Sequence, residues 1–334
     1  MKKSCIVGFG EIGLYHSKLF NELPFAELYA VCDIEEKKLK RAANLFHGVK
    51  CFRNYDDVLE DVNIDVIHIC TPHHLHCEMV EKALSAGKDV LLEKPVCINI
   101  DEFNRIKRAE EKSSNILGII LQNRINPTTR KMLAELTNIG KLLGVSGRVL
   151  WSRDEKYYNM DEWRGKWRTE GGGVMINQAI HTFDILGYIT GGFTSVFGSI
   201  STKKLGNIIE VEDTADAHLE TAMGADAIFY ASNCYPVNTP VMIEITGEYA
   251  TLRLEDNHLY KIQNGKAELI ESDIKNESLK SYWGIGHKAV FYNFYKYLEV
   301  GEGAYTTLKD TENTMKTIFA LYESAKRNER VEII

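Results

Sequence analysis

A glycine-rich segment near the start of the chain has the spacing of a phosphate-binding loop. The segment Gly8-Phe9-Gly10-Glu11-Ile12-Gly13 reads G-x-G-x-x-G, follows an apolar run and opens a helical pattern. In such a loop the first glycine makes the turn, the second lets a pyrophosphate approach the backbone, and the third lets the helix pack against the strand. The N–H groups and positive dipole at the helix N-terminus favour phosphate. The segment predicts a dinucleotide site, with a tight strand–helix turn as the alternative.

An acidic residue at the end of the next apolar run suits the ribose of such a ligand. Asp33 stands 20 residues after Gly13, where a carboxylate can accept hydrogen bonds from both ribose hydroxyls. It would repel an adenosine 2′-phosphate, and no arginine follows it directly, while Lys37 and Lys38 are expected on the following helix. We therefore expect NAD as the cofactor, with NADP less favoured. A helix-capping aspartate is the alternative.

Lys94 and His181 offer the chemistry that oxidation of an alcohol needs, which is a positive group for the developing alkoxide and a base for the O–H proton. Lys94 follows a predicted strand at residues 90–92, and doubly wound sheets bind ligands at the carboxyl ends of their strands. Asn177, His181 and Asp184 are spaced so that a helix would carry them on one face. A solvated turn lysine and a core or capping histidine are the alternatives.

The elements that position these residues alternate in the first part of the chain. Strands are predicted at residues 4–7, 28–32, 49–52, 65–70, 90–92 and 116–121, and helices at 11–22, 35–46, 74–86 and 101–112. Strands that are apolar on both faces and separated by helices indicate a parallel sheet with crossovers. We therefore predict a doubly wound α/β domain over residues 1–123.

The pattern changes after this domain. Helices are predicted at residues 128–137 and 174–190, and strands at 145–152, 196–202, 215–221, 227–232, 242–246, 251–254 and 259–262. Hairpin-type turns at Gly247-Glu248 and Asn264-Gly265 indicate a large, mostly antiparallel sheet. We predict an α+β domain for substrate binding and oligomerisation over residues 124–305.

The C-terminal part is predicted to contain two helices, which begin near His287 and Thr307. Thr307 and Asp310 have the spacing of a capping box. Residues 306–334 are expected to form a C-terminal helix and strand that pack back near the first domain. Because few helices are left to cover the sheet of the second domain, we expect a homodimer or homotetramer joined through it.

Composition excludes several classes of protein. The chain has 334 residues, is 44% apolar and 26% charged, and carries a net charge of −7, which fits a folded protein of about two domains and argues against a nucleic-acid partner. No apolar stretch approaches the roughly 20 residues of a membrane span, and the N-terminus shows no cleavable signal. The seven cysteines have no CxxC spacing, so neither disulfides nor a zinc knuckle is expected. We expect a cytoplasmic protein.

Two further motifs follow predicted strands, Thr71-Pro72-His73-His74-Leu75-His76 and Glu93-Lys94-Pro95, and a glycine triplet at 171–173 precedes His181. With the glycine loop, these motifs resemble the Gfo/Idh/MocA oxidoreductase family, which includes inositol dehydrogenases and glucose–fructose oxidoreductase. The resemblance spans essentially the whole chain. It implies an N-terminal Rossmann domain, a C-terminal domain whose open sheet pairs subunits, and hydride transfer between the nicotinamide and a sugar-like alcohol carbon.

The resemblance also implies roles for particular residues. Lys94 would contact the reacting hydroxyl, in a loop with a cis Lys94–Pro95 bond, and His181 would be the general base. Asn177 stands where the family commonly has aspartate, as it does in some relatives that act on nucleotide sugars, and it would orient the site. The cofactor-binding residues would be Gly8, Phe9, Gly10, Glu11, Ile12, Gly13, Asp33, Thr71, Pro72, His73, His76, Glu93, Lys94 and Asn123. The family uses no metal, so the three histidines of the 71–76 segment are not expected to bind one.

Aromatic and basic side chains directly precede the helix of His181. Residues 151–167 contain five aromatic residues and four basic ones, namely Trp151, Tyr157, Tyr158, Trp163 and Trp167 with Arg153, Lys156, Arg164 and Lys166. Aromatic faces stack on sugar rings, and arginine binds carboxylate or phosphate. The expected substrate contacts are Arg124, Tyr158, Trp163, Arg164, Asp184 and His287. A packed surface loop is the alternative for residues 151–167, and a helix N-terminal residue is the alternative for His287.

The main functional hypothesis is an NAD-dependent dehydrogenase acting on a hydroxyl of a sugar, polyol or nucleotide sugar. One alternative is an NAD-dependent glycosidase that oxidises its substrate transiently. Another is a regulator that binds a dinucleotide without catalysis, although the presence of both Lys94 and His181 argues against it.

Overall fold

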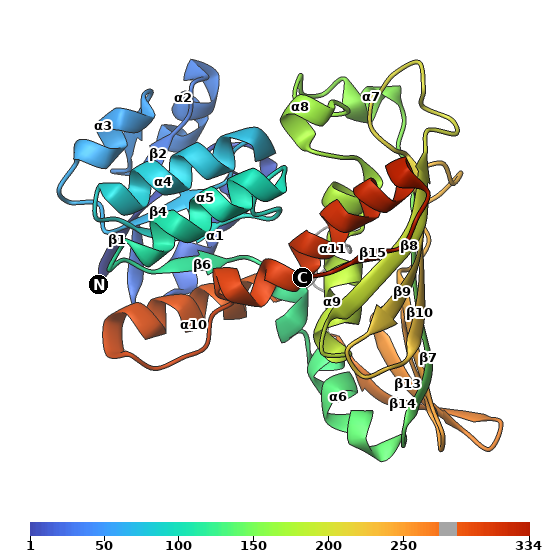
Figure 1. Cartoon of the computed structure of the whole chain (residues 1–334). Helices are drawn as coiled ribbons and strands as arrows, with labels where there is room; N and C mark the ends of the chain where they lie inside the picture. The colour runs from blue at the N-terminus through green and yellow to red at the C-terminus, as the bar shows by residue number, and fades with distance from the viewer. Residues whose placement is uncertain (274–285) are drawn as a thin grey trace. The chain divides into compact units, whose positions relative to one another are not determined.

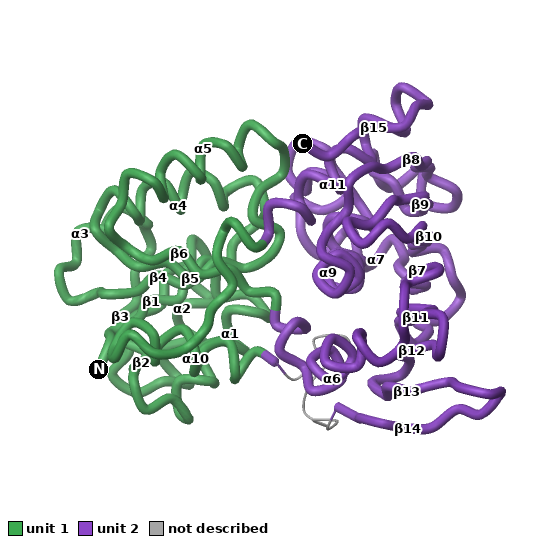
Figure 2. Tube along the Cα trace, turned by 60° about the horizontal axis from the view of Figure 1, so that its bottom comes forward, with its two compact units in different colours: residues 1–121, 287–310 green, residues 122–286, 311–334 purple. Residues whose placement is uncertain are grey.

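The chain folds into two compact units. The computed structural model describes residues 1–273 and 286–334, and its units are residues 1–121 with 287–310 and residues 122–286 with 311–334 (Figure 2). The expected division was 1–123, 124–305 and 306–334. The structure differs in placing residues 287–310 with the first unit and residues 311–334 with the second.

The first unit contains a six-stranded sheet in the order β3-β2-β1-β4-β5-β6. Its strands are β1 (Lys2–Val7), β2 (Ala26–Cys32), β3 (Lys50–Phe52), β4 (Val66–Ile69), β5 (Asp89–Leu92) and β6 (Leu117–Ile119). Each strand is parallel to its neighbours, and β4 and β5 are buried along their whole length. The predicted doubly wound α/β architecture is confirmed.

Helices connect these strands (Figure 1). They are α1 (Glu11–Leu19) with the 3-10 turn η1 (Phe20–Glu22), α2 (Glu36–Leu45), α3 (Tyr55–Glu60), η2 (His73–Leu75), α4 (His76–Ser85) and α5 (Ile100–Glu111). The sequence did not predict α3, because its six residues are too few to show a helical period. Asn54 caps it by accepting a hydrogen bond from the backbone N–H of Asp56 at 3.2 Å.

Helix α10 (His287–Val300) belongs to the first unit because its aromatic face completes the core of that unit. The hydroxyl of buried Tyr295 lies 2.6 Å from Ser4 Oγ on β1 and 2.5 Å from His68 Nε2 on β4. Phe294 packs so closely on β6 that a Cβ at Gly118 would lie 2.7 Å from its ring. This packing explains the departure from the expected domain boundary.

The second unit contains a nine-stranded sheet in the order β14-β13-β12-β11-β7-β10-β9-β8-β15. Its strands are β7 (Leu142–Leu150), β8 (Phe193–Ser201), β9 (Thr214–Thr221), β10 (Asp226–Ser232), β11 (Met242–Gly247), β12 (Thr251–Glu255), β13 (His258–Gln263), β14 (Lys266–Ser272) and β15 (Val331–Glu332). Strands β7 and β10 pair in parallel, and the other neighbours are antiparallel. The predicted mostly antiparallel sheet is confirmed.

The sequence analysis missed one edge strand of this sheet, β14, which is largely exposed. The strand expected within residues 306–334 is the two-residue β15, and it pairs with β8 in the second unit. The turn before β14 is the predicted one, since Asn264 and Gly265 have φ values of 53° and 73° and join the paired residues Gln263 and Lys266. Two successive positive φ values are the mark of a tight hairpin turn.

The helical elements of the second unit are η3 (Gln122–Ile125), α6 (Pro127–Glu135), η4 (Leu136–Asn138), α7 (Glu155–Tyr158), α8 (Trp167–Glu170), a π-helical turn η5 (Val174–Gln178), α9 (Ile180–Ile189) and most of α11 (Leu308–Arg327). Helix α9 covers one face of the sheet, with the rings of Phe183 and Phe229 5.1 Å apart. Among the described residues, no helix is long and apolar enough to cross a bilayer.

Candidate active site

The glycine loop after β1 has the shape that a dinucleotide requires. Gly8 has a φ of +91°, and a Cβ there would lie 2.6 Å from Cys70 O. A Cβ at Gly13 would lie 2.0 Å from Gly8 O, whereas one at Gly10 would meet nothing within 4 Å. Gly8 and Gly13 therefore serve the fold, and the space beside Gly10 lets a phosphate approach the start of α1, where Glu11 and Ile12 follow. The loop fits the expected cofactor.

Asp33 joins the end of β2 to this loop. Its Oδ2 accepts a hydrogen bond from the backbone N–H of Phe9 at 2.7 Å, and its Oδ1 accepts one from Glu35 at 2.9 Å. Lys38 lies on α2 as expected, but its ammonium group turns back to within 3.6 Å of Asp33 and 2.6 Å of Glu35. The ring of Phe9 is buried against Phe46, so only its backbone is available to a cofactor.

The loops after β4 and β5 are joined by His76. Its Nδ1 lies 2.7 Å from Pro95 O, and its Nε2 lies 2.9 Å from Thr71 O. The side chain is fully buried, so it supports the loops, which corrects the expectation that it contacts the cofactor. His73 is also buried, whereas Thr71 and Pro72 are partly exposed at the end of β4.

The Glu-Lys-Pro loop follows β5, and the Lys94–Pro95 bond is cis, as expected. Glu93 points into the unit, where its Oε1 lies 3.0 Å from His16 Nε2 and 3.8 Å from His287 Nε2. Its Oε2 accepts a hydrogen bond from the Lys94 backbone N–H at 3.1 Å. Lys94 itself is partly exposed at the end of the strand.

His287 does not have the environment expected of a substrate contact. It is buried in the first unit at the start of α10 and faces Glu93. The nitrogen and oxygen atoms of His16, Glu93 and His287 that could bind a metal ion lie within 4.8 Å of one another. The sequence did not single out His16.

The helix expected at residues 174–190 is broken, because Ala179 N donates to Val174 O, five residues earlier, at 2.7 Å. Asn177 lies in the resulting π-helical turn, while His181 and Asp184 lie in α9. The three residues therefore do not share one regular helical face, which corrects that expectation.

A buried carboxylate, Glu212, holds this turn. It accepts hydrogen bonds from the backbone N–H groups of Gly173 at 2.8 Å and Met175 at 3.1 Å, and from the Tyr322 hydroxyl at 3.1 Å. Burial raises the pKa of Glu212 to about 7, although these hydrogen bonds oppose the shift. A Cβ at Gly173 would lie 1.9 Å from Glu212 O, so the glycine triplet permits this close approach.

Asn177 binds a second buried carboxylate, Glu170, which the sequence analysis did not identify. The Asn177 amide nitrogen lies 2.5 Å from Glu170 Oε1, and Glu170 Oε2 accepts a hydrogen bond from Gly165 N at 2.5 Å. Because a carboxylate only accepts hydrogen bonds, the amide group must face Glu170 with its nitrogen. This contact fixes the orientation of Asn177.

His181 is partly buried at the start of α9. Its Nε2 lies 3.4 Å from the amide nitrogen of Gln122, a residue of η3 that the sequence analysis passed over. An amide nitrogen donates, so this long hydrogen bond places a lone pair on His181 Nε2. In the same turn, Asn123 Oδ1 is buried without a hydrogen-bond partner among the described residues.

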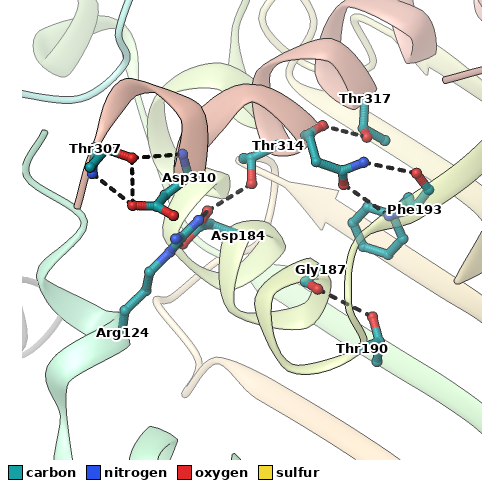
Figure 3. A network of polar contacts seen from close by, with 10 residues as sticks. Arg124, Asp184, Gly187, Thr190, Phe193, Thr307, Asp310, Thr314 and Thr317 are labelled. Atoms are coloured by element: carbon teal, nitrogen blue, oxygen red, sulfur yellow. Dashed lines mark hydrogen bonds and ion pairs between the residues drawn. The ribbon is translucent and has the colours of Figure 1, made fainter. Parts of the chain in front are cut away.

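Arg124 and Asp184, both expected to contact a substrate, bind each other (Figure 3). Arg124 donates to the two carboxylate oxygens of Asp184 at 2.7 and 2.6 Å, and Thr314 donates to Asp184 Oδ1 at 2.7 Å. Asp184 is fully buried, so the pair ties η3 and α9 to α11. The same view shows the predicted capping box, in which Asp310 N donates to Thr307 Oγ1 at 3.2 Å.

Within residues 151–167, Tyr158 is a core residue, whereas Trp163 and Arg164 are partly exposed. Tyr158 is buried in an apolar cluster with Leu205, Ile209 and Val211, which corrects the expectation that it contacts a substrate. Arg164 lies 4.6 Å from the ring centre of Trp163 and donates to the Tyr157 hydroxyl at 2.6 Å. The Trp163–Arg164 pair is partly exposed and stays a predicted substrate contact.

Comparisons with known proteins agree with this architecture. Residues 2–121 match a family model described as the oxidoreductase family with an NAD-binding Rossmann fold, GFO_IDH_MocA. Residues 128–253 match the model of the GFO/IDH/MocA C-terminal domain.

Several named proteins are similar to the chain. The uncharacterized oxidoreductase YrbE of Bacillus subtilis is 27% identical over 275 residues, which is 80% of this chain and 78% of that protein. The myo-inositol 2-dehydrogenase of Thermotoga maritima is 28% identical over 56% of this chain and 54% of its own length. The WlbA dehydrogenase of Bordetella pertussis, solved with NADH and UDP-GlcNAcA, is 26% identical with a TM-score of 0.86, over 100% of this chain and 99% of that one.

Proposed function

The chain belongs to the Gfo/Idh/MocA family of NAD-binding oxidoreductases, and on that basis we propose that it transfers a hydride between NAD and a hydroxyl carbon of a sugar, polyol or nucleotide sugar. The observation that carries the proposal is the position of Lys94, at the carboxyl end of β5 in the unit that holds the glycine loop. Ligands of doubly wound sheets bind at this edge.

In the proposed oxidation, Lys94 holds and polarises the hydroxyl oxygen, and His181 accepts its proton. Asn177 orients the site and does not ionise. NAD, when bound, supplies the hydride acceptor. Among the substrate classes, a nucleotide sugar or sugar acid is supported by the partly exposed Trp163–Arg164 pair, because an aromatic face suits a sugar ring and a guanidinium suits phosphate or carboxylate.

An NAD-reduction screen over sugars, inositols, sugar acids and nucleotide sugars tests the function. A true substrate should produce NADH and an oxidised product in equal amounts. Cleavage of a glycoside without net NADH would instead identify the glycosidase alternative. Binding of NAD without turnover on any class would favour the regulator.

We expect the preference for NAD over NADP to depend on the negative charge of Asp33 and the positive charge of Lys38. NAD should bind more tightly than NADP by a factor on the order of 10, since a like-charge clash at Asp33 of roughly 1.4 kcal/mol corresponds to that ratio. Asp33→Asn should reduce the ratio of the NADP and NAD dissociation constants. Lys38→Ala should increase this ratio, because the ammonium group near Asp33 would attract a 2′-phosphate. Calorimetry that shows equal or tighter NADP binding to the unmodified protein would contradict this expectation.

We also propose that the protein is a homodimer or a dimer of dimers joined through the sheet of the second unit. Phe197 on β8 and Ile228 on β10 flank His218 in one cross-strand row, and both apolar side chains are exposed. Ile228→Asp should shift the mass measured by light scattering at micromolar concentration toward the monomer. Ile34→Asp, at an exposed position of the first unit, is the matched control. An unmodified protein that is monomeric would overturn the proposal.

We propose that the protein is cytoplasmic. All seven cysteines are free thiols, and five of them are buried. This is the usual state of cysteine in a reducing compartment.

A further inference from the structure

A buried polar cluster lies behind the Lys94 loop, within the first unit. His16 comes from α1, Glu93 from the end of β5 and His287 from the start of α10. All three side chains are buried, and the chemistry assigned to Lys94 and His181 uses none of them. A buried charge lowers stability unless it is paired and hydrogen-bonded, so we asked what the burial of these three side chains contributes to the protein.

The hydrogen positions in this cluster follow from its neighbours. Cys70 Sγ lies 3.2 Å from His16 Nδ1, and burial raises the pKa of the Cys70 thiol well above its usual value. The thiol therefore keeps its hydrogen and donates it to Nδ1. Burial lowers the pKa of His16, so the ring is neutral and its remaining hydrogen sits on Nε2, 3.0 Å from Glu93 Oε1. Both nitrogens are used, which fixes the ring.

Glu93 is thereby held as an anion. Burial alone would raise its pKa, but the hydrogen bond from His16 and the nearby His287 ring, whose Nε2 lies 3.8 Å from Oε1, outweigh burial and leave the pKa well below its usual value. The 3.0 Å separation of His16 Nε2 and Glu93 Oε1 is that of a hydrogen bond. A hydrogen bond therefore explains why His16 Nε2 and Glu93 Oε1 lie so close together, without a cation between them.

The second oxygen of Glu93 acts on the next residue. Oε2 accepts the backbone N–H of Lys94 at 3.1 Å, and on the other side His76 lies 2.7 Å from Pro95 O. The main chain is thus held immediately before and immediately after Lys94. His76 belongs to α4, which directly precedes β5, whereas His16 and His287 come from α1 and α10, which are distant from β5 in the sequence.

We propose that His16 and His287 are positioning residues for Lys94, acting through Glu93. The inference rests on the proposed role of Lys94 at the reacting oxygen. Displacement of a catalytic group by about 1 Å can cost about 10²-fold in rate. Loss of the clamp on Glu93 should therefore lower kcat while the glycine loop still binds NAD.

The test is a double-mutant cycle with Lys94. His16→Leu removes the hydrogen bond to Glu93 and should lower kcat by about 10- to 100-fold, and His16→Gln, which can still donate, should restore most of the loss. The dissociation constant of NAD should change by much less than kcat.

In the Lys94→Ala background, His16→Leu should change kcat by less than about twofold, because the effects of residues that act as a unit are not additive. His47→Leu, at an exposed position of the same unit, is the control.

The outcomes separate the possibilities. An equal loss with and without Lys94, or a loss explained by weaker NAD binding, would show a merely structural role and overturn the inference. If Lys94→Ala lowers kcat but neither His16→Leu nor His287→Leu does, the inference fails and the proposed function stands. If Lys94→Ala leaves kcat unchanged, the proposed role of Lys94 fails as well. Should His16→Leu not fold, Glu93→Gln replaces it in the same cycle with the same expectation.

Discussion

Lys94→Ala should lower kcat for oxidation of the physiological substrate by roughly 10³-fold, the upper range for removal of one group that stabilises developing negative charge. Lys94 lies just beyond the end of β5 and is partly exposed, and in the variant an alkoxide that develops beside it would lose its positive partner. Steady-state kinetics with saturating NAD would measure the loss. NAD binding should stay nearly normal, because the glycine loop from Gly8 to Gly13 is unchanged.

A lysine outside the site provides the control for this prediction. Lys112, exposed after α5, should tolerate alanine without a change in kcat. Lys94→Arg tests geometry separately from charge, since a planar guanidinium does not replace a compact ammonium. Near-normal turnover by Lys94→Ala would remove Lys94 from the chemical step.

His181→Ala should lower kcat/KM by about 10²- to 10⁴-fold, the usual effect of losing a general base. A histidine accepts a proton only when neutral, so kcat/KM of the unmodified enzyme should rise with pH as the histidine loses its proton and then level off. The variant should lose this rise. Profiles of kcat/KM against pH for both proteins would measure it.

Gln122 supplies a companion variant. Its amide nitrogen lies 3.4 Å from His181 Nε2, so Gln122→Leu should change the pH profile without removing the base. If His181→Ala retained near-normal turnover on a true substrate, another group would have to accept the proton, and Lys94 would be the first candidate.

Local features of the fold were predictable because they leave a local pattern. The glycine loop shows its backbone requirement in the spacing of Gly8, Gly10 and Gly13, and buried parallel strands show apolar runs. Helix α3 was missed because six residues show no period, and β14 because its side chains are exposed and polar. The π-helical turn was missed because a hydrogen bond from Ala179 to Val174 changes no residue type.

Contacts between distant residues were not predictable in the same way. Arg124 and Asp184 are 60 residues apart, and each alone looks like a charged group available to a substrate, but together they form a buried ion pair. His16 and Glu93 are 77 residues apart. Lys94 and His181 could be singled out from the sequence because their neighbours match family motifs. The contacts that hold the site, such as the one between His16 and Glu93, leave no such local pattern.

The interleaving of the two units has a consequence for biosynthesis. The chain passes between the units after residues 121, 286 and 310, so α10 is translated only after residues 122–286. Because translation adds about 5–20 residues per second, α10 is synthesised on the order of ten seconds or more after the six strands of the first unit. Until then the surface that Phe291 and Tyr295 will cover is exposed, and His68 and Ser4 lack the Tyr295 hydroxyl. The first unit therefore exposes apolar surface during this interval, and its folding is complete only after α10 has been synthesised.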